Sequence, residues 1–427
     1  HDGNGCFSTR DGTYTLTLKE LNRNVVNALP PKWRRDVRCR HLIVAGKLTA
    51  TSTNGGRTLF SEGFLQVPWL QIVDLEYGPL APSQVDLKWR LTFEDGQLNI
   101  KVLHLNAASG ALRTADLDVQ GRIALPFDRG KSVLEINSEI LDLQALAAVG
   151  YRAATPAERR KPKKPDEDKP DERLDLRELD LVVHVAIAQL LYGEVAATDL
   201  AAEIRIDDRT ITATRVDAVL SGAPLHIEGT MDLGVTDYTY TLAASLGAVD
   251  LQPFLIAFGP PPLHQQLQGR LSGFDLNLQG RGFQRQDLET SMTGSLELGL
   301  EHLVIQNIPD LTAIARQANL PELNRLEFNH GILRAGTGAQ GINVQALTLR
   351  GEDLTAVATG AMDFGLALNL KLGLAVAGDL EKRLTGNGMD QVLGERLDGR
   401  RPLSFAIPIG GTLLAPRVAF RIDALTP

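Results

Sequence analysis

The amino-acid sequence predicts a mainly β fold: an elongated, curved antiparallel β-sheet that forms a repeating β-groove, with a few short helices. Three observations predict it. Apolar and polar residues alternate with a period of two over many segments, turn sequences separate these segments, and one pattern occurs three times along the chain. Alternation with a period of two places apolar side chains on one face of a sheet and polar side chains on the other.

The alternation is clearest in residues 366–376, and it recurs in residues 274–278 and 296–300. We expect the large apolar residues of these segments to line the inner face of the groove: Phe274, Leu276, Leu278, Leu296, Leu298, Leu300, Leu366, Leu368, Leu370, Leu372, Leu374 and Val376. Alternation alone does not distinguish such a lining from the core of a dry β-sandwich, so both interpretations stay open at this point.

The threefold pattern consists of a glycine inside an alternating stretch, followed about twenty residues later by an Asp-Leu pair. The glycines are Gly121, Gly229 and Gly360, and the pairs are Asp142-Leu143, Asp250-Leu251 and Asp379-Leu380. A repeated supersecondary unit indicates an array in which each copy buries its apolar face against its neighbours.

Turns and helices are predicted between the strands. The sequences of residues 53–56, 94–96 and 207–209 are typical of tight turns. Short helices are expected over residues 17–29, 143–149, 252–258 and 310–318, and the Asp of each Asp-Leu-Gln, Asp142 and Asp250, is expected to cap a helix, with Pro253 in a first turn.

Residues 158–173 are different because they contain no apolar side chain and carry nearly balanced charge. Such a composition is typical of a disordered, solvated linker. The sequence therefore predicts three regions: a β-rich region with the first repeat (1–150), a charged linker (151–173), and a β-groove region with the two further repeats (174–427).

Composition excludes some partners. The formal net charge of -8 argues against a general affinity for nucleic acid or anionic lipid, because both reward a basic surface. Cys6 and Cys39 are the only cysteines, and they are either a disulfide or two unrelated thiols. No apolar run reaches the roughly 20 residues of a membrane span. Because the chain begins with His1, we expect a processed or excerpted chain whose membrane tether is not included.

The motifs do not predict an enzyme, a cofactor or a metal. The glycines of residues 336–341 match a dinucleotide-binding fingerprint, but a strand pattern follows them, so we expect a hairpin turn. His104, His184 and His226 have no second metal-binding residue at ligand spacing along the sequence.

One basic cluster interrupts the acidic chain, and it consists of Lys32, Arg34, Arg35, Arg38 and Arg40. It is a candidate contact for phosphate head groups or for an acidic partner; the alternative is a solvated sheet edge that opposes aggregation.

Residues 174–425 resemble the AsmA family of Gram-negative envelope proteins, whose relatives include TamB and the bridge-like lipid-transfer proteins. Three passages carry the resemblance, and they are residues 174–234, residues 249–294 and the terminal segment 403–416 with its glycine-threonine turn and proline. The resemblance rests on the order of these passages, because each motif alone is degenerate.

The resemblance implies a curved β-sheet with an apolar inner face, exposed to the periplasm and associated with the inner membrane. It implies a role in phospholipid trafficking or outer-membrane biogenesis, with phospholipid or another acyl-chain lipid as the ligand. The alternative is a non-enzymatic assembly protein, whose apolar face is covered by its own helices or by a protein partner of the envelope.

Overall fold

The computed structural model describes residues 11–22, 24, 38–74, 78–79, 83–110, 112–125, 130–145, 179–235, 238–259, 263–282, 287, 290–317, 320–338, 341–386, 388, 390–413 and 415–418. These residues are mainly β, with antiparallel strands and a few short helices, which confirms the predicted fold class. The chain divides into two compact units, His1–Val216 and Asp217–Pro427.

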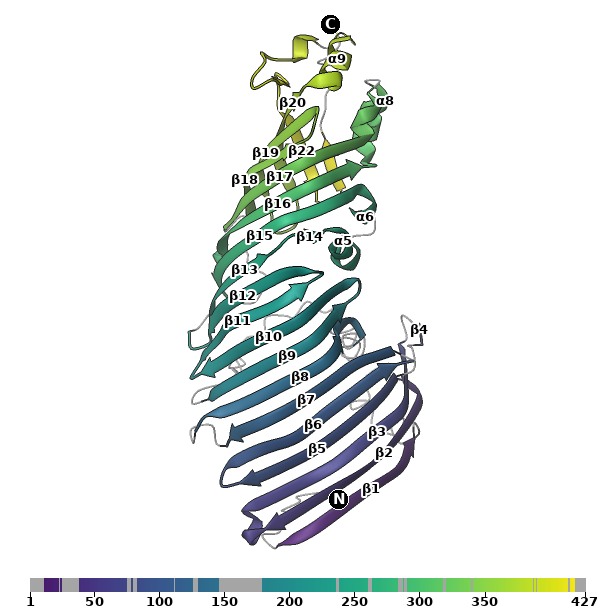
Figure 1. Cartoon of the computed structure of the whole chain (residues 1–427), viewed down its shortest axis with the longest axis vertical. Helices are drawn as coiled ribbons and strands as arrows, with labels where there is room; N and C mark the ends of the chain where they lie inside the picture. Colours follow the sequence, from purple (N-terminus) through teal and green to yellow (C-terminus); the bar gives the residue numbers. More distant parts are fainter. Residues whose placement is uncertain are drawn as a thin grey trace, which may run out of the picture. The chain divides into compact units, whose positions relative to one another are not determined.

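In the first unit, most consecutive strands are antiparallel neighbours in one sheet (Figure 1). The strands are β1 (Gly12–Asn22), β2 (Arg38–Thr53), β3 (Thr58–Asp74), β4 (Gly78–Pro79), β5 (Ser83–Glu94), β6 (Gln97–Ser109), β7 (Leu112–Ala124), β8 (Ser132–Asp142), β9 (Asp180–Tyr192) and β10 (Val195–Asp207); β11 (Thr210–Leu220) contains the division between the units.

Strands β8 and β9 pair in parallel, which departs from the antiparallel prediction. Their register runs from Ser132 opposite Leu181 to Asp142 opposite Leu191. A parallel pair requires a crossover connection, and the charged residues 158–173 belong to this connection but lie outside the described residues. Because β9 and β10 belong to the first unit, the predicted boundary at residues 151–173 does not coincide with the division between the units.

The second unit continues with antiparallel pairs. Its strands are β12 (Ala223–Asp232), β13 (Thr239–Leu246), β14 (Val249–Asp250), β15 (Leu267–Arg281), β16 (Thr293–Gln306), β17 (Arg325–Gly338), β18 (Gly341–Arg350), β19 (Leu354–Met362), β20 (Leu368–Val376), β21 (Arg401–Pro402), β22 (Ile407–Thr412) and β23 (Ala415–Val418). The helices are α5 (Gln252–Phe258), α6 (Leu263–Gln266), α8 (Pro309–Gln317) and α9 (Gly378–Gly386), with short 3-10 turns η1 (Asn54–Gly56) in the first unit and η4 (Pro321–Asn324) and η5 (Asp390–Val392) in the second.

The predicted turns form as expected. Asp95 and Gly96 have left-handed φ values of 50° and 75° between β5 and β6, and Asp208 has φ 49° between β10 and β11. Gly338 pairs with Gly341, so the glycines that match a dinucleotide fingerprint form a hairpin between β17 and β18.

Two of the predicted helices agree closely with the structure, namely α5 and α8. A helical turn also begins at residue 143, where Oδ1 of Asp142 accepts a hydrogen bond from the amide of Ala145 at 2.9 Å, as expected of an N-cap. The other predicted cap is wrong, because Asp250 ends β14 and makes no cap to α5. The third repeated Asp, Asp379, lies inside the first turn of α9, where its carboxylate binds Lys382.

The helix predicted over residues 17–29 is wrong in its first part, because residues 12–22 form strand β1. The cause is a β-bulge: the register with β2 shifts between Leu18 and Leu21, and Glu20 has a left-handed φ of 59°. A bulge inserts one residue into the alternation and so produces an apolar spacing of three, which is also typical of a helix. Residues 25–29 lie outside the described residues.

Two clusters of buried apolar side chains form in the second unit. The larger one contains Phe328, which is 2% exposed, together with buried leucines of β16, β18, β19, α9 and the loop before β21. The smaller one contains Ala223, Val249 and Leu271, with Phe254 of α5 packed against it. Both clusters lie where helices meet the sheet.

Candidate functional site

The apolar face of the sheet in the second unit is built from rows of side chains that cross from strand to strand. Leu276 lies opposite Leu296, and the row continues through Ala335, Val344, Gly360 and Leu370 to Ile409. A parallel row begins at Phe274 and continues through Leu298, Leu333, Leu347, Ala358 and Leu372 to Ile407.

The register therefore brings the sequence-predicted residues of β15, β16 and β20 to one face. Leu278 and Leu368 belong to a third row, and Leu300 and Leu374 belong to a fourth. Val376 lies at the end of β20 on the same face and is buried. The neighbouring residues along these strands, such as Asn277, Glu297 and Lys371, are exposed on the opposite face.

Leu366 is an exception among the predicted lining residues. It precedes β20 in the turn after β19, has a left-handed φ of 67°, and is 36% exposed. Its amide donates to the carbonyl oxygen of Asp363 at 2.9 Å, and its carbonyl oxygen accepts from the amide of Leu413. The alternation continues through the turn in the sequence, but the strand does not, so Leu366 does not extend the rows.

Each repeated glycine lies opposite a leucine on the apolar face. Gly121 pairs with Leu134, Gly229 pairs with Leu242, and Gly360 pairs with Leu370. A Cβ atom at Gly360 would lie 2.2 Å from the carbonyl oxygen of Asn369, and φ at this residue is 143°. The repeat therefore marks places where the neighbouring strand approaches too closely for a side chain.

Most side chains in these rows are half-buried. Leu276, Leu278, Leu296, Leu298, Leu370 and Leu372 are neither fully buried nor fully exposed. In a two-layer β-sandwich such residues would be buried by the facing sheet. Among the described residues of this unit, helices and the last strands cover part of the face near its C-terminal end, and the remaining part stays accessible.

The covered part encloses an apolar cavity of about 270 Å³. Its wall is formed by Phe328, Leu349, Leu370, Leu372 and Leu374 from the sheet, and by apolar side chains from α8, η4, α9 and η5 on the other side. Every lining residue is apolar. The volume is slightly below the usual range of small-molecule pockets, about 300–1,000 Å³.

The last strand closes this end of the face. The backbone amide of Val418 on β23 donates a 3.0 Å hydrogen bond to Oδ2 of Asp310 at the start of α8. Because β23 is the last strand among the described residues and α8 follows β16, this bond joins two parts of the unit that are far apart in the sequence. The apolar cavity lies between the two.

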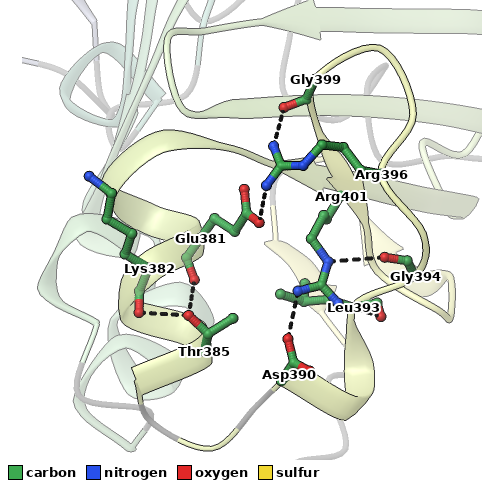
Figure 2. A network of polar contacts seen from close by, with 9 residues as sticks. All are labelled: Glu381, Lys382, Thr385, Asp390, Leu393, Gly394, Arg396, Gly399 and Arg401. Atoms are coloured by element: carbon green, nitrogen blue, oxygen red, sulfur yellow. Dashed lines mark hydrogen bonds and ion pairs between the residues drawn. The ribbon is translucent and has the colours of Figure 1, made fainter.

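A polar network holds the segment that covers the cavity, from α9 to η5 and the loop before β21 (Figure 2). Arg396 donates to Oε1 of the largely buried Glu381 at 2.5 Å and to the carbonyl oxygen of Gly399 at 2.7 Å. Arg401 donates to Oδ1 of Asp390 at 2.6 Å and to the carbonyl oxygens of Leu393 and Gly394. We call residues 378–401 the cap, because its buried Leu380, Leu384, Val392 and Leu393 pack against the apolar residues below.

Charges on the outside of the cap are solvated. Lys382 donates to Oδ1 of Asp379 at 2.8 Å, and this hydrogen bond holds the pKa of the Asp379 carboxyl below its ordinary value. That contribution to stability is lost as the pH falls through the lowered pKa of Asp379. Both side chains are more than three-quarters exposed, so the pair contributes little to the stability of the cap.

Among the described residues, the hydroxyls of Tyr240 on β13 and Thr337 on β17 lie on the apolar face without a hydrogen-bond partner. Tyr240 lies opposite Gly280, whose missing side chain leaves room for the phenol. Burial raises the pKa of Tyr240, because the phenolate is less well solvated there than in water. Any stability that depends on the neutral phenol is therefore lost only when the pH rises above the ordinary tyrosine value of about 10.

The first unit carries an apolar face of the same kind. Its central row starts at Leu16 and Leu48, passes Gly63, Trp89, Leu103, Val119 and Ile136, and ends at Val185 and Ala202. Leu16 and Tyr14, on strand β1, are 56% and 54% exposed. None of these residues is among the lining residues predicted from the sequence.

Several predicted residues fall where the structure gives no side-chain information. Cys6, Lys32, Arg34 and Arg35 lie outside the described residues. Arg38, Cys39 and Arg40 belong to β2, but their side chains are not described. The predicted disulfide and the predicted basic contact therefore stay predictions.

Histidine–carboxylate pairs are a structural feature that sequence reasoning missed. His104 lies 2.8 Å from Asp118, His226 lies 2.8 Å from Asp217, and His184 lies 3.9 Å from Glu203. Each partner comes from a neighbouring strand, so spacing along the sequence gave no signal. A strand-register prediction would have found the pairs of His104 and His184, whose partners lie directly opposite them.

Comparisons with known proteins add no identification: no protein-family model, curated protein or solved structure matches this chain. Within the described residues, no helix has the length and apolar character needed to cross a membrane.

Proposed function

We propose that this chain is a non-enzymatic, AsmA-like protein that binds phospholipid or another acyl-chain lipid along the apolar face of its sheet. The proposed setting is the periplasm of a Gram-negative-type cell envelope, in association with the inner membrane. There the protein would contribute to phospholipid trafficking or outer-membrane biogenesis. The proposal needs no cofactor, metal or nucleic acid.

The observation that supports this proposal best is the set of apolar rows that cross consecutive strands while their side chains stay half-buried. Exposure of an acyl chain to water costs about 0.8 kcal/mol per methylene, so two chains of about sixteen carbons cost on the order of 25 kcal/mol. A row of leucines at every strand offsets part of this cost at each step, with no need for a specific pocket.

The supporting experiment is native mass spectrometry with lipid extraction on protein purified from envelope membranes. We expect at least one phospholipid per chain. Leu276→Glu and Leu370→Glu place a charge on the apolar face, and each should reduce bound lipid by at least about tenfold, because an unpaired buried carboxylate costs several kcal/mol. Alanine at the same positions should have a milder effect.

Matched controls come from the opposite face of the same strands. Asn277→Glu and Asn369→Glu add the same charge at exposed neighbouring positions and should retain the lipid. Retention of lipid by Leu276→Glu and Leu370→Glu would show that these strands do not contact lipid.

The second candidate is an assembly protein of the envelope, and the closed C-terminal end favours it. There the chain covers its own apolar face with α8, the cap and the last strands. Under this candidate the purified wild-type chain carries no lipid and forms a stable complex with an envelope protein. That result in the same mass spectrometry experiment would replace the lipid proposal.

A further inference from the structure

Three side chains of types that can ligate a metal meet on the polar face of the first unit. His104 on β6 lies directly opposite Asp118 on β7, and Asp116 is the next residue of β7 on that face. Nδ1 of His104 lies 2.8 Å from Oδ1 of Asp118 and 3.6 Å from Oδ1 of Asp116. Within the part of the chain that the structure describes, this is the one group of three such residues whose ligand atoms all lie within 4.8 Å of one another.

Asp116 provides an independent indication of a ligand. Its side chain is 9% exposed, so nine-tenths of this carboxylate is buried. Oδ2 forms an ion pair with Arg113, but Oδ1, which points towards His104, has no hydrogen-bond partner. A buried carboxylate oxygen without a donor carries a desolvation cost that a bound cation would remove.

We propose that His104, Asp116 and Asp118 bind a divalent first-row transition-metal ion, for which Zn²⁺ is the natural probe. Zinc binds imidazole nitrogen and carboxylate oxygen at about 2.0–2.2 Å, so ligand atoms of one tetrahedral or octahedral ion lie about 3.0–3.5 Å apart. The two measured separations, 2.8 Å and 3.6 Å, bracket this range. All three ligand atoms lie within 4.8 Å of one another, so side-chain rotations can bring them around one ion.

The surroundings favour a cation with an open coordination position. Asp116 and Asp118 border a surface depression of about 450 Å³, which Glu139 and Asp199 also line. Ala186, Ala188 and Ala201 contribute small side chains to the depression, so water or a ligand group can reach the ion. Arg113 also binds Glu139, at 2.7 Å, and neutralises only part of this negative charge.

The pair formed by His226 and Asp217 has the same histidine–carboxylate contact as the proposed site but, within the described ranges, lacks a third ligand. Its Nδ1–Oδ1 distance is also 2.8 Å, but it does not belong to a group of three ligands among the described residues. Two protein ligands bind a transition metal much more weakly than three do. This pair is therefore the matched control.

The test is isothermal titration calorimetry of the full chain with Zn²⁺, checked by equilibrium dialysis and elemental analysis. We expect one saturable equivalent per chain. His104→Ala and Asp118→Asn should each weaken that binding by at least about tenfold, while His226→Ala should leave it unchanged. Arg113→Gln should strengthen it, because a competing positive charge is removed.

Asp118→Asn keeps the size of the side chain, so it remains informative if His104→Ala does not fold. Circular dichroism of each variant checks the fold. The proposal is overturned if the wild-type chain shows no saturable binding up to millimolar Zn²⁺. It is also overturned if His104→Ala and Asp118→Asn, both folded, bind Zn²⁺ as the wild type does. Either result would identify the group as an ion-paired histidine only.

Discussion

Gly360 illustrates how single residues set the spacing between strands of this sheet. Its φ of 143° is unfavourable for any residue with a Cβ atom, and that atom would meet the carbonyl oxygen of Asn369 on β20. Leu370 lies directly opposite and occupies the apolar face at this point. The glycine therefore allows β19 and β20 to approach while the leucine fills the row.

We predict that Gly360→Ala destabilises the protein by about 2 kcal/mol or more, since backbone strain of this kind alone costs about 1–3 kcal/mol. Urea unfolding followed by circular dichroism measures the change. Gly273→Ala is the control, because an added Cβ at Gly273 meets no atom within 4 Å and φ there is not left-handed. Equal stabilities of the two variants would contradict this account of the repeated glycine.

The sequence predicted which face of the sheet a side chain occupies better than it predicted which side chains contact each other. The alternation assigned Leu276, Leu298 and Leu372 to one face, and the register places them there. Leu366 was assigned wrongly because a turn can continue an alternating pattern without continuing the strand. The contact between His104 and Asp118 could not be predicted, because it depends on the register of two strands, which the sequence pattern left open.

At the scale of elements, the cap is the part of the second unit that depends most on polar contacts. Arg401 is its central donor, with hydrogen bonds to Asp390, Leu393 and Gly394, and its side chain is only 20% exposed. These contacts join the loop before β21 to η5, and the apolar side chains of α9 and η5 are buried beside them.

Arg401→Ala is therefore predicted to loosen the cap, with a local loss of about 2 kcal/mol, because hydrogen bonds from a charged donor contribute about 1.5–3 kcal/mol. Hydrogen–deuterium exchange should show faster exchange in α9 and η5, with β15 and β16 unchanged. Lys382→Ala, which alters an exposed cap residue, should leave the exchange as it is. If Arg401→Ala also left exchange in α9 and η5 unchanged, apolar packing alone would hold the cap.

Helices and strands were predicted well where the spacing of apolar residues and the residues that begin or end an element indicated the same structure. Residues 252–258 form α5 as predicted, with Pro253 in the first turn. Residues 17–22 were predicted as helix because the bulge at Glu20 changed the spacing of Leu18 and Leu21. A β-bulge and one turn of helix give similar short patterns, and pairing with a neighbouring strand decides between them.

At the scale of the whole chain, the parallel pair of β8 and β9 was the feature furthest from sequence reasoning. Asp142, at the end of β8, lies beside Leu191, whereas the start of β9 lies near Leu181. The chain must therefore run back along ten residues of β9, which is about 33 Å. Residues 143–179 make this connection, and the charged segment 158–173 is part of it. The connection is much longer than the distance requires, since an extended chain covers about 3.3–3.6 Å per residue.

Deletion of residues 158–173 should therefore leave the fold unchanged. The 21 residues that remain of the connection reach up to about 70 Å when extended, well beyond the required distance. Shortening the loop by less than half changes its closure entropy by less than about 0.6 kcal/mol, so the urea midpoint should hardly move. A Gly/Ser replacement of equal length separates the effect of charge from that of length.

A deletion that leaves only eight residues between β8 and β9 reaches about 29 Å at most and cannot span the return path. This variant should lose the parallel pair, with rapid hydrogen exchange along β8 and β9, while the sixteen-residue deletion retains slow exchange there. If the sixteen-residue deletion also gave rapid exchange along β8 and β9, the charged segment would have to stabilise the sheet directly. Unchanged exchange in both variants would instead show that β8 and β9 are not parallel partners.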